Sequence, residues 1–359
     1  MISLNSHRWM VSQRVLVLLL ALFCQISPLA QETNEETKKG SYSGAKVTVH
    51  PAWFKESFLE LEEDIAEAAQ QNKRLMLFFD QDGCPYCNKL IEDNFTRPHI
   101  EKNVRSNFEV VAINLWGDRD VIQVGGKSFS EKTLAQALRV NFTPTLLFFD
   151  ERKQVVLRLN GYYPPDKFEI ALNYVSTHQE NITTFSDYMA QNWNRTDSDI
   201  NASISLRDWS LLPPYHLDNL TNSKPLAVIF EEPNCDNCDL LYNKTFKDPQ
   251  AADLLAQFNL VQLNRWADIA LTTPSGTQVT AAEWATALDV GYLPTIVFFD
   301  AAGLEVMQAD SQLRTFHMLS VFDYVAHQQY KDSEGFQRFL SKRSDRLREQ
   351  GIDVDIWKY

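Results

Sequence analysis

The feature that most constrains this chain is that it repeats itself at a spacing of 150 to 151 residues. At a shift of 151 residues, Cys84 and Cys87 fall on Cys235 and Cys238. Further matches along the two halves are Phe95 with Phe246, Pro98 with Pro249, Asn114 with Asn264, Trp116 with Trp266, Pro144 with Pro294 and Tyr174 with Tyr324. A repeat of this length is a whole domain rather than a solenoid unit. The 359 residues are enough for two such domains, each with its own core.

Both halves show the same alternation of apolar runs and helical patterns. The expected strands are 75–79 and 227–230, 109–115 and 260–265, 145–149 and 295–299, and 155–159 and 305–308. Helices are expected after each Cys-x-x-Cys, over 130–138 and 281–288, and at the end of each half. The strand runs are rich in β-branched and aromatic residues, which is typical of a sheet covered on both faces. The pattern therefore predicts an α/β fold in each half.

The chain divides at changes in composition. Residues 1–30 carry Arg8 and Arg14 and then an apolar run over 15–24, which is typical of a cleaved secretory signal peptide. We expect a flexible segment at 31–50, a first domain at 51–190, a linker rich in Asn, Asp and Ser at 191–205, a second domain at 206–342 and a C-terminal tail at 343–359. The tail and the polar end of the last helix are interpreted as solvated surface. The signal peptide predicts secretion across an inner membrane into a bacterial periplasm.

Charge and composition exclude several classes of protein. With 34 Lys and Arg against 47 Asp and Glu, the formal net charge is −13, so nucleic acid is not an expected partner. The apolar run at 15–24 is too short for a membrane span. The seven histidines form no cluster typical of metal ligands, so no metal and no cofactor is expected.

The two Cys-x-x-Cys pairs carry the chemistry. A cysteine in the first turn of a helix lies at the positive end of the helix dipole, which favours the nucleophilic thiolate. A second cysteine three residues later is close enough to resolve a mixed disulfide formed by the first. This predicts Cys84 and Cys235 as nucleophiles and Cys87 and Cys238 as resolving thiols. The alternatives are a zinc site made by both pairs, or structural disulfides.

The first half contains the segments LMLFFDQDGCPYC, NFTPTLLFFD and RLNGYYPPDKFEIALNYV. These segments resemble the thioredoxin-fold superfamily, and within it the periplasmic SoxW-like thioredoxin proteins. The resemblance is strong over 51–190 and weaker over 206–342. It implies two tandem thioredoxin-like domains, each a central mixed sheet flanked by helices. It further implies that Pro144 and Pro294 are cis prolines beside the cysteines.

The resemblance also implies a set of substrate contacts. The residues before the cis prolines, Thr143 and Leu293, would offer their backbones to an extended substrate. Apart from the resemblance, the dipeptide between the first pair of cysteines, Pro85 and Tyr86, is rigid and apolar and so is suited to contacting a protein substrate. The alternative for Pro144 and Pro294 is a tight turn without a role in binding.

The sequence departs from the superfamily at its buried acid. That position, six residues before the first cysteine, is Phe78 in one half and Ile229 in the other. Each half instead has an acid four residues before its first cysteine, Asp80 and Glu231, which are candidates for proton transfer with the resolving thiol. The alternative is that both are solvated carboxylates at strand ends.

The two motifs differ in the residue that follows the nucleophile. Asp236 follows Cys235 and disfavours its thiolate, whereas Pro85 follows Cys84. The loop after the last strand has Gly161 in the first half and Ser311 in the second, and the resemblance gives such a glycine the role of leaving room for substrate. These differences favour the first domain as the main catalyst.

Together these features predict a thiol–disulfide oxidoreductase that acts on secreted or periplasmic proteins. Reduction of disulfides is the expected direction, and oxidation of thiols is the alternative, because the direction depends on reduction potentials. The partners would be proteins that carry disulfides or thiols, and a membrane electron donor is a candidate. The alternative is a module that binds peptides or a soft metal ion without redox turnover.

Overall fold

The computed structural model describes residues 38–193, 203–220, 223–332 and 334–358. The predicted signal peptide lies outside the described residues, as does most of the predicted linker. Residues 39–359 form one compact unit. No helix of the described part is long and apolar enough to cross a membrane.

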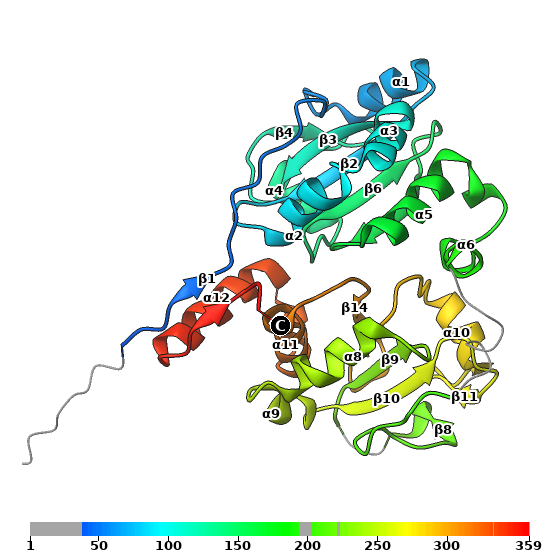
Figure 1. Ribbon diagram of the computed structural model, residues 1–359, viewed down its shortest axis with the longest axis vertical. Helices are drawn as coiled ribbons and strands as arrows, with labels where there is room; N and C mark the ends of the chain where they lie inside the picture. The colour runs from blue at the N-terminus through cyan, green and yellow to red at the C-terminus, as the bar shows by residue number, and fades with distance from the viewer. Residues whose placement is uncertain (1–37, 194–202, 221–222, 333, 359) are drawn as a thin grey trace, which may run out of the picture. The chain divides into compact units, whose positions relative to one another are not determined.

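The first half is built around a four-stranded mixed sheet in the order β3-β2-β6-β7 (Figure 1). Strand β2 pairs parallel with β3 and antiparallel with β6, and β6 pairs antiparallel with β7. The elements of this half are α1 (Leu61–Gln70), β2 (Arg74–Asp80), α2 (Pro85–Lys89), the π-helical turn η1 (Leu90–Asn94), α3 (Pro98–Asn107), β3 (Phe108–Asn114), β4 (Asp120–Ile122), β5 (Ser128–Ser130), α4 (Glu131–Ala137), β6 (Thr145–Phe149), β7 (Val155–Asn160), α5 (Pro165–Ser176), η2 (Gln179–Asn181) and α6 (Phe185–Asn192).

The second half repeats this architecture with a sheet in the order β10-β9-β13-β14. The parallel and antiparallel pairings match those of the first half strand for strand. The elements are β8 (Tyr215–His216), η3 (Leu217–Asn219), β9 (Leu226–Glu231), α8 (Asp236–Asn243), η4 (Thr245–Lys247), α9 (Ala251–Leu255), β10 (Asn259–Asn264), β11 (Ala270–Thr272), β12 (Gln278–Thr280), α10 (Ala281–Ala287), β13 (Thr295–Phe299), β14 (Glu305–Ala309), α11 (Thr315–Ala326), η5 (Gln329–Lys331), α12 (Phe336–Glu349) and β15 (Val354–Asp355).

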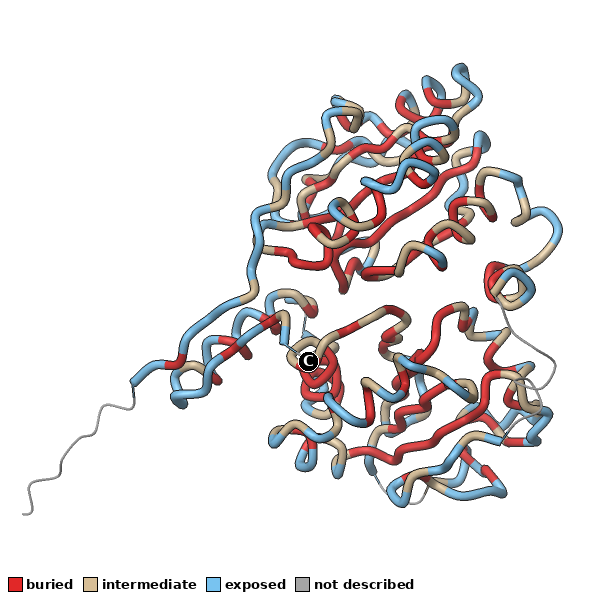
Figure 2. The backbone as a smooth tube through the Cα atoms, viewed as in Figure 1, coloured by how far each residue is buried: buried red, intermediate tan, exposed pale blue. Residues whose placement is uncertain are grey.

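The central strands are buried on both faces, which is why they read as continuous apolar runs (Figure 2). Successive side chains of a strand point to opposite faces. Met76 and Phe78 therefore enter the core beneath α2, α3 and α5, whereas Leu77 and Phe79 enter the core shared with α1 and α4. The predicted strands agree with the observed ones to within two residues, and the predicted α/β fold with two mixed sheets is confirmed.

The chain ends differ from the sequence-based interpretation. Within the predicted flexible segment 31–50, Tyr42–Ser43 forms β1, which pairs parallel with β15. Helix α12 runs through residue 342, where the sequence placed the end of the second domain. Arg343 is not solvated, as that interpretation had it, but 3% exposed, and it donates to Asp323 at 2.8 Å. Arg343 of α12 therefore binds the rest of the second domain through a buried ion pair.

Equivalent loops of the two halves contact each other. Asn160 Nδ2 donates to Asp310 Oδ2 at 3.2 Å, and these residues lie at matching positions of the repeat. Gly161 has φ +77°, and a Cβ placed on it would lie 2.2 Å from Ser311 Oγ. A side chain at 161 would therefore require Ser311 to move, so the two loops pack closely here. Gly161 also lines a cavity next to the first cysteine pair, and its role of leaving room for substrate stays a prediction.

Candidate active site

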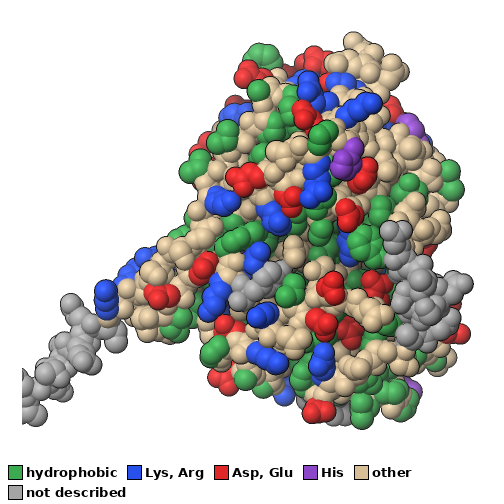
Figure 3. Space-filling view, viewed as in Figure 1, with side chains coloured by type: hydrophobic (Ala, Val, Ile, Leu, Met, Phe, Trp, Pro, Cys, Tyr) green, Lys and Arg blue, Asp and Glu red, His purple; other side chains and the backbone are tan. Residues whose placement is uncertain are grey.

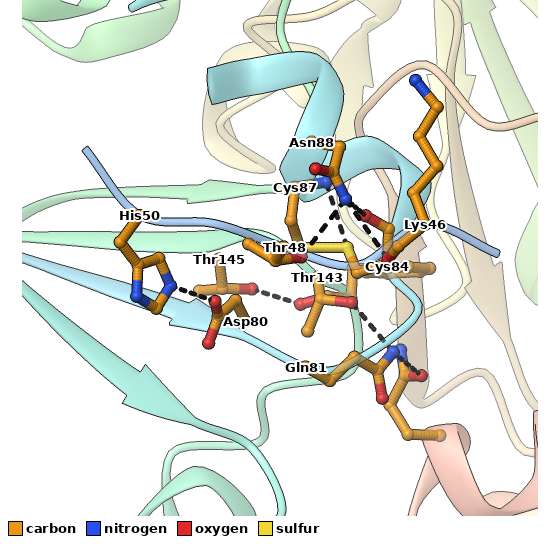
Figure 4. The surroundings of a disulfide bond; sticks show 12 residues. Lys46, Thr48, His50, Asp80, Gln81, Cys84, Cys87, Asn88, Thr143 and Thr145 are labelled. Carbon is orange, nitrogen blue, oxygen red and sulfur yellow. Dashed lines mark hydrogen bonds and ion pairs between the residues drawn. A yellow bond between two sulfur atoms is a disulfide. The ribbon is translucent and has the colours of Figure 1, made fainter. Parts of the chain in front are cut away.

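The first Cys-x-x-Cys lies where β2 turns into α2, and its cysteines form a disulfide (Figure 4). Gly83 has φ +78°, a value that glycine adopts without strain, and it brings the chain into the helix. Cys84 is the N-cap of α2, and its Sγ accepts the backbone N–H of Cys87 at 3.0 Å. Pro85 occupies the first helical turn, where no N–H donor is needed. The sulfur predicted to be the nucleophile therefore receives a hydrogen bond that stabilises a thiolate.

The second motif repeats this geometry. Cys235 is the N-cap of α8, and its Sγ accepts the N–H of Cys238 at 3.1 Å. Asn234 has φ +58°, so it takes the left-handed conformation that Gly83 takes in the first half. Cys235 and Cys238 also form a disulfide. Both predicted cysteine pairs are therefore joined by disulfides.

Both predicted proline positions hold cis peptide bonds, Thr143–Pro144 and Leu293–Pro294. Thr143 Oγ1 accepts from Gln81 Nε2 at 3.0 Å, as Figure 4 shows. Thr143 and Leu293 are only 7% and 6% exposed. Their roles in substrate binding stay predictions.

The acid of the first half is buried and paired, so it is not a solvated carboxylate. Asp80 is 5% exposed, and its Oδ2 lies 2.5 Å from Nε2 of His50 (Figure 4). His50 stacks on Phe54 and meets Phe78 edge-on. Sequence reasoning did not identify His50, because it precedes Asp80 by 30 residues and belongs to no recognisable motif.

The N-terminal segment that supplies His50 also crosses the first motif. Asn88 Nδ2, on the helix that carries Cys87, lies 3.3 Å from both the backbone oxygen of Lys46 and Oγ1 of Thr48. The same amide donates to the backbone oxygen of Cys84 at 3.1 Å. We call residues 45–50 the N-terminal strap. It lies beside the disulfide in Figure 4.

The acid of the second half is also buried, and so it too differs from a solvated carboxylate. Glu231 is 4% exposed, and its two oxygens accept from Tyr242 Oη at 2.5 Å and from Gln262 Nε2 at 2.8 Å. Burial raises the pKa of Glu231 above its ordinary value, against the opposing effect of these two hydrogen bonds. Tyr242 and Gln262 were missed because neither stands at a spacing that a sequence motif records. The two halves therefore hold their acids by different partners.

The two disulfides differ in exposure. Cys84 is 3% exposed and Cys87 is fully buried, whereas Cys235 is partly exposed. Tyr86 is 4% exposed, contrary to the expectation that it is presented to a protein substrate. The second half covers it: Tyr86 Oη accepts the N–H of Arg314 at 2.9 Å.

A cavity of about 320 Å³ opens beside Cys84. Tyr86 and Thr143 line it from the first half, and residues of α11 and α12 line it from the second. One of these is His317, whose Nδ1 lies 3.3 Å from Tyr86 Oη. Burial lowers the pKa of His317 to about 4, so its imidazole is neutral at neutral pH.

The tryptophans that recur in the repeat each donate a hydrogen bond from the ring nitrogen. Trp116 is 38% exposed and its Nε1 donates to Gln81 at 2.8 Å, next to Thr143. Trp266 Nε1 donates to Glu232 at 3.0 Å. Among the described residues, no group of three or more His, Cys, Asp or Glu side chains is arranged to hold a metal ion. On the face drawn in Figure 3, acidic and basic side chains are interspersed.

The chain is similar to one protein family and to several solved structures. The thioredoxin-like domain family matches residues 61–176 and again 218–326. No curated protein matches the chain. A thioredoxin-fold protein from Helicobacter pylori is 21% identical, with 34% of this chain and 80% of that one covered and a TM-score of 0.31. A thioredoxin from Thermus thermophilus is 21% identical, with coverages of 38% and 87% and a TM-score of 0.26. The first two thioredoxin domains of Saccharomyces cerevisiae Eps1p are 12% identical, with coverages of 76% and 99% and a TM-score of 0.23. Since the family spans more than half of the chain and matches once around each cysteine pair, this protein belongs to the thioredoxin-like domain family and carries two tandem copies of the domain.

Proposed function

We propose that this protein is a thiol–disulfide oxidoreductase that works through both Cys-x-x-Cys pairs. One observation carries the proposal: in each half, the first cysteine caps a helix and its sulfur accepts the N–H of the second. Each half also holds a cis proline at the position that the sequence predicted. A capped sulfur is a good nucleophile and a good leaving group, because the hydrogen bond and the helix N-terminus stabilise its thiolate. The second cysteine is in place to resolve the mixed disulfide.

In the proposed reaction, the Cys235 thiolate attacks a partner disulfide and releases one partner thiolate. The Cys238 thiolate then attacks the mixed disulfide at Cys235, so the partner leaves fully reduced and the protein holds the Cys235–Cys238 disulfide. Two electrons pass to the partner, and an external thiol donor must return them. Partial exposure of Cys235 favours this pair as the one that meets proteins.

We further propose that the net direction is reduction of partner disulfides. Asp236 lies next to Cys235, and Cys87 is fully buried. A nearby negative charge and burial both disfavour thiolates, which makes a dithiol more reducing. The periplasmic location, the membrane electron donor and membership of the SoxW-like group belong to the same proposal and rest on the sequence. We also propose that the reaction needs no bound cofactor.

The candidates for proton transfer are Asp80 with His50 in the first half and Glu231 in the second. Both carboxylates are buried and hydrogen-bonded, as a group that exchanges protons inside a protein must be. The alternative function, binding of a peptide or a soft metal ion without turnover, is favoured by no contact of the described residues. A protein with the alternative function would bind its peptide or metal ion without any change in the number of free thiols.

The test is reduction of insulin by dithiothreitol, followed by turbidity. We expect the intact protein to accelerate it and Cys235→Ser/Cys238→Ser to lose most of the acceleration. The variant with all four cysteines replaced by serine is the control for effects of the fold alone. Equal rates for the intact protein and this control would refute the proposal.

Redox titration of each pair then assigns the direction. A potential near about −270 mV indicates a reductase, whereas one near about −120 mV indicates an oxidase of folding proteins. An oxidase value in both pairs would refute the proposed direction while leaving the oxidoreductase proposal intact.

A further inference from the structure

The first disulfide is covered against proteins but open to a cavity. Cys84 is 3% exposed, and the small surface that it retains lines the cavity of about 320 Å³ described above. That volume lies at the lower end of the range for small-molecule sites, about 300 to 1,000 Å³. A small ligand can therefore reach Cys84 where an extended protein chain cannot.

Arg314, His317 and Trp357 cover Tyr86, and we call these three residues the cover. Tyr86 is held by Arg314, by His317 and by the ring of Trp357, whose centroid is 5.1 Å away and edge-on. Trp357 follows β15, which β1 fixes by parallel pairing. The protein-binding face expected of the Pro85–Tyr86 dipeptide is thus occupied by the second half and the C-terminal residues.

The cavity lining also carries complementary charges. Arg348 and Asp345 both line it, and Arg348 Nη1 lies 3.3 Å from Asp345 Oδ1. A ligand with one carboxylate and one ammonium group would match this pair, since guanidinium groups bind carboxylates and carboxylates bind ammonium groups. Gln81, Gln337 and Ser341 add neutral polar groups to the lining.

We propose that this cavity is the substrate site of the first domain and that it takes amino-acid-like, low-molecular-weight thiols and disulfides, while the cover excludes proteins. The proposal rests on the proposed oxidoreductase function and assigns a substrate class to one of its two pairs. Arg348 and Asp345 bind the charged groups of the substrate, and Trp357 determines specificity by closing the cover over Tyr86.

The proposed reaction needs only the small disulfide and the two thiols of the first pair, and its bonds and electrons balance. The Cys84 thiolate attacks one sulfur of a small disulfide RSSR, which breaks its S–S bond, releases RS⁻ and leaves RS–Cys84. The Cys87 thiolate then attacks Cys84, which forms the Cys84–Cys87 disulfide and releases a second RS⁻. The protein loses two electrons and the small disulfide gains them. The reverse sequence oxidises two thiols.

The experiment uses the full chain with Cys235→Ser/Cys238→Ser, so that only Cys84 and Cys87 react. The protein is reduced, freed of reductant and mixed with cystine, with the uncharged hydroxyethyl disulfide or with insulin. Samples are quenched in acid, and the remaining thiols are alkylated and counted by mass spectrometry. Trp357→Ala and Arg348→Gln are tested in this background. Trp209→Ala, which removes a ring packed on Tyr242 and Phe246 in the second half, is the matched control.

We expect cystine to oxidise the pair at a rate that saturates with its concentration, and insulin to react at least about tenfold more slowly. Arg348→Gln should slow cystine by about tenfold, as expected for loss of a charged hydrogen bond, and leave hydroxyethyl disulfide within about twofold. Trp357→Ala should accelerate insulin, whereas Trp209→Ala should not.

Insulin reacting as fast as cystine, or Arg348→Gln slowing both small disulfides equally, would overturn the assignment of substrate class while leaving the oxidoreductase function standing. If none of the three disulfides oxidised the pair, the first domain would not be a redox site, and the proposed function would fail there as well. Circular dichroism of each variant identifies any that is misfolded. Arg348 Nε also donates to the backbone oxygen of Gly40 at 3.1 Å, close to β1. Faster oxidation by insulin in Arg348→Gln would therefore mean that this variant had loosened the cover, and the assignment of Arg348 to substrate binding would fall.

Discussion

The carboxylate of Asp310 lies in the contact between the two halves and makes the stability of that contact depend on pH. Its Oδ2 accepts from Asn160, but its Oδ1 is buried with no hydrogen-bond partner. Burial raises the pKa of Asp310 from 3.8 to about 7. An uncompensated buried charge disfavours the folded state, so the folded protein keeps a proton here that the unfolded chain has released.

The sign of the effect follows from the two pKa values. Below about pH 4 the group is protonated in both states and has no effect on stability. Between about pH 4 and about pH 7 the folded state binds more protons than the unfolded chain, so the free energy of unfolding falls as pH rises. Above about pH 7 the loss is complete. At 1.36 kcal/mol per pKa unit, the rise from 3.8 to about 7 amounts to a loss of up to about 4 kcal/mol.

Asp310→Asn should remove this loss, because the amide oxygen can still accept from Asn160 and carries no charge. We expect the variant to be more stable than the parent near about pH 8, and its advantage to be smaller by about 2 to 3 kcal/mol near about pH 5. The measurement is urea unfolding at both pH values with the disulfides intact, followed by tryptophan fluorescence. Asp268→Asn, at an exposed position, is the control. An advantage of Asp310→Asn that is equal at both pH values would refute the reasoning.

Three further predictions concern exposure, the cover and helix capping. In the reduced protein, a maleimide carried on a polymer too large for the cavity should label Cys235 at least about tenfold faster than Cys84, because Cys235 is partly exposed and Cys84 is reached only through the cavity. Mass spectrometry of the peptides that stay unlabelled measures both rates. Tyr86→Phe removes the hydroxyl that accepts from Arg314 and should lower the free energy of unfolding in urea by about 1 kcal/mol. Thr280→Ala removes the capping box of α10 and should lower it by about 1 kcal/mol as well, whereas Thr280→Ser should restore most of the loss.

Each of these has a result that contradicts it. Equal labelling of Cys84 and Cys235 would mean that the cover does not protect the first motif in solution. If Tyr86→Phe left the urea midpoint unchanged, the hydrogen bond from Arg314 to the Tyr86 hydroxyl would add nothing to the free energy of unfolding. A serine at 280 that is as destabilising as alanine would mean that the cap is not the cause.

Local features of the site could be predicted because they depend on residues close together in the chain. A cysteine at the N-cap and a second one three residues later make their own hydrogen bond within one helical turn, as Cys84 and Cys87 do. The strands were recognisable because burial on both faces favours a continuous apolar run, as over residues 75–79 in the middle of β2. The tandem fold followed from the repeat itself.

The surroundings of the acids could not be predicted, because their partners come from distant parts of the chain. Asp80 and Glu231 hold matching positions in the repeat, yet one pairs with His50 and the other with Tyr242 and Gln262. A carboxylate at the end of a strand is normally solvated, so no local pattern indicated burial. Only the packing of the strap and of α8 removed these groups from water.

The amino-acid sequence by itself therefore determined the two α/β domains and the cysteine pairs at helix starts, since each depends on short-range pattern and backbone chemistry. The cis prolines were expected only from the resemblance to a known family. The tertiary structure alone decided which disulfide is accessible. Tyr86 contacts Arg314 across 228 residues, and β1 pairs with β15 across the length of both domains. Contacts between residues so far apart in the chain form when two folded surfaces pack together. Local sequence patterns indicate each element, but they do not indicate which distant element it packs against.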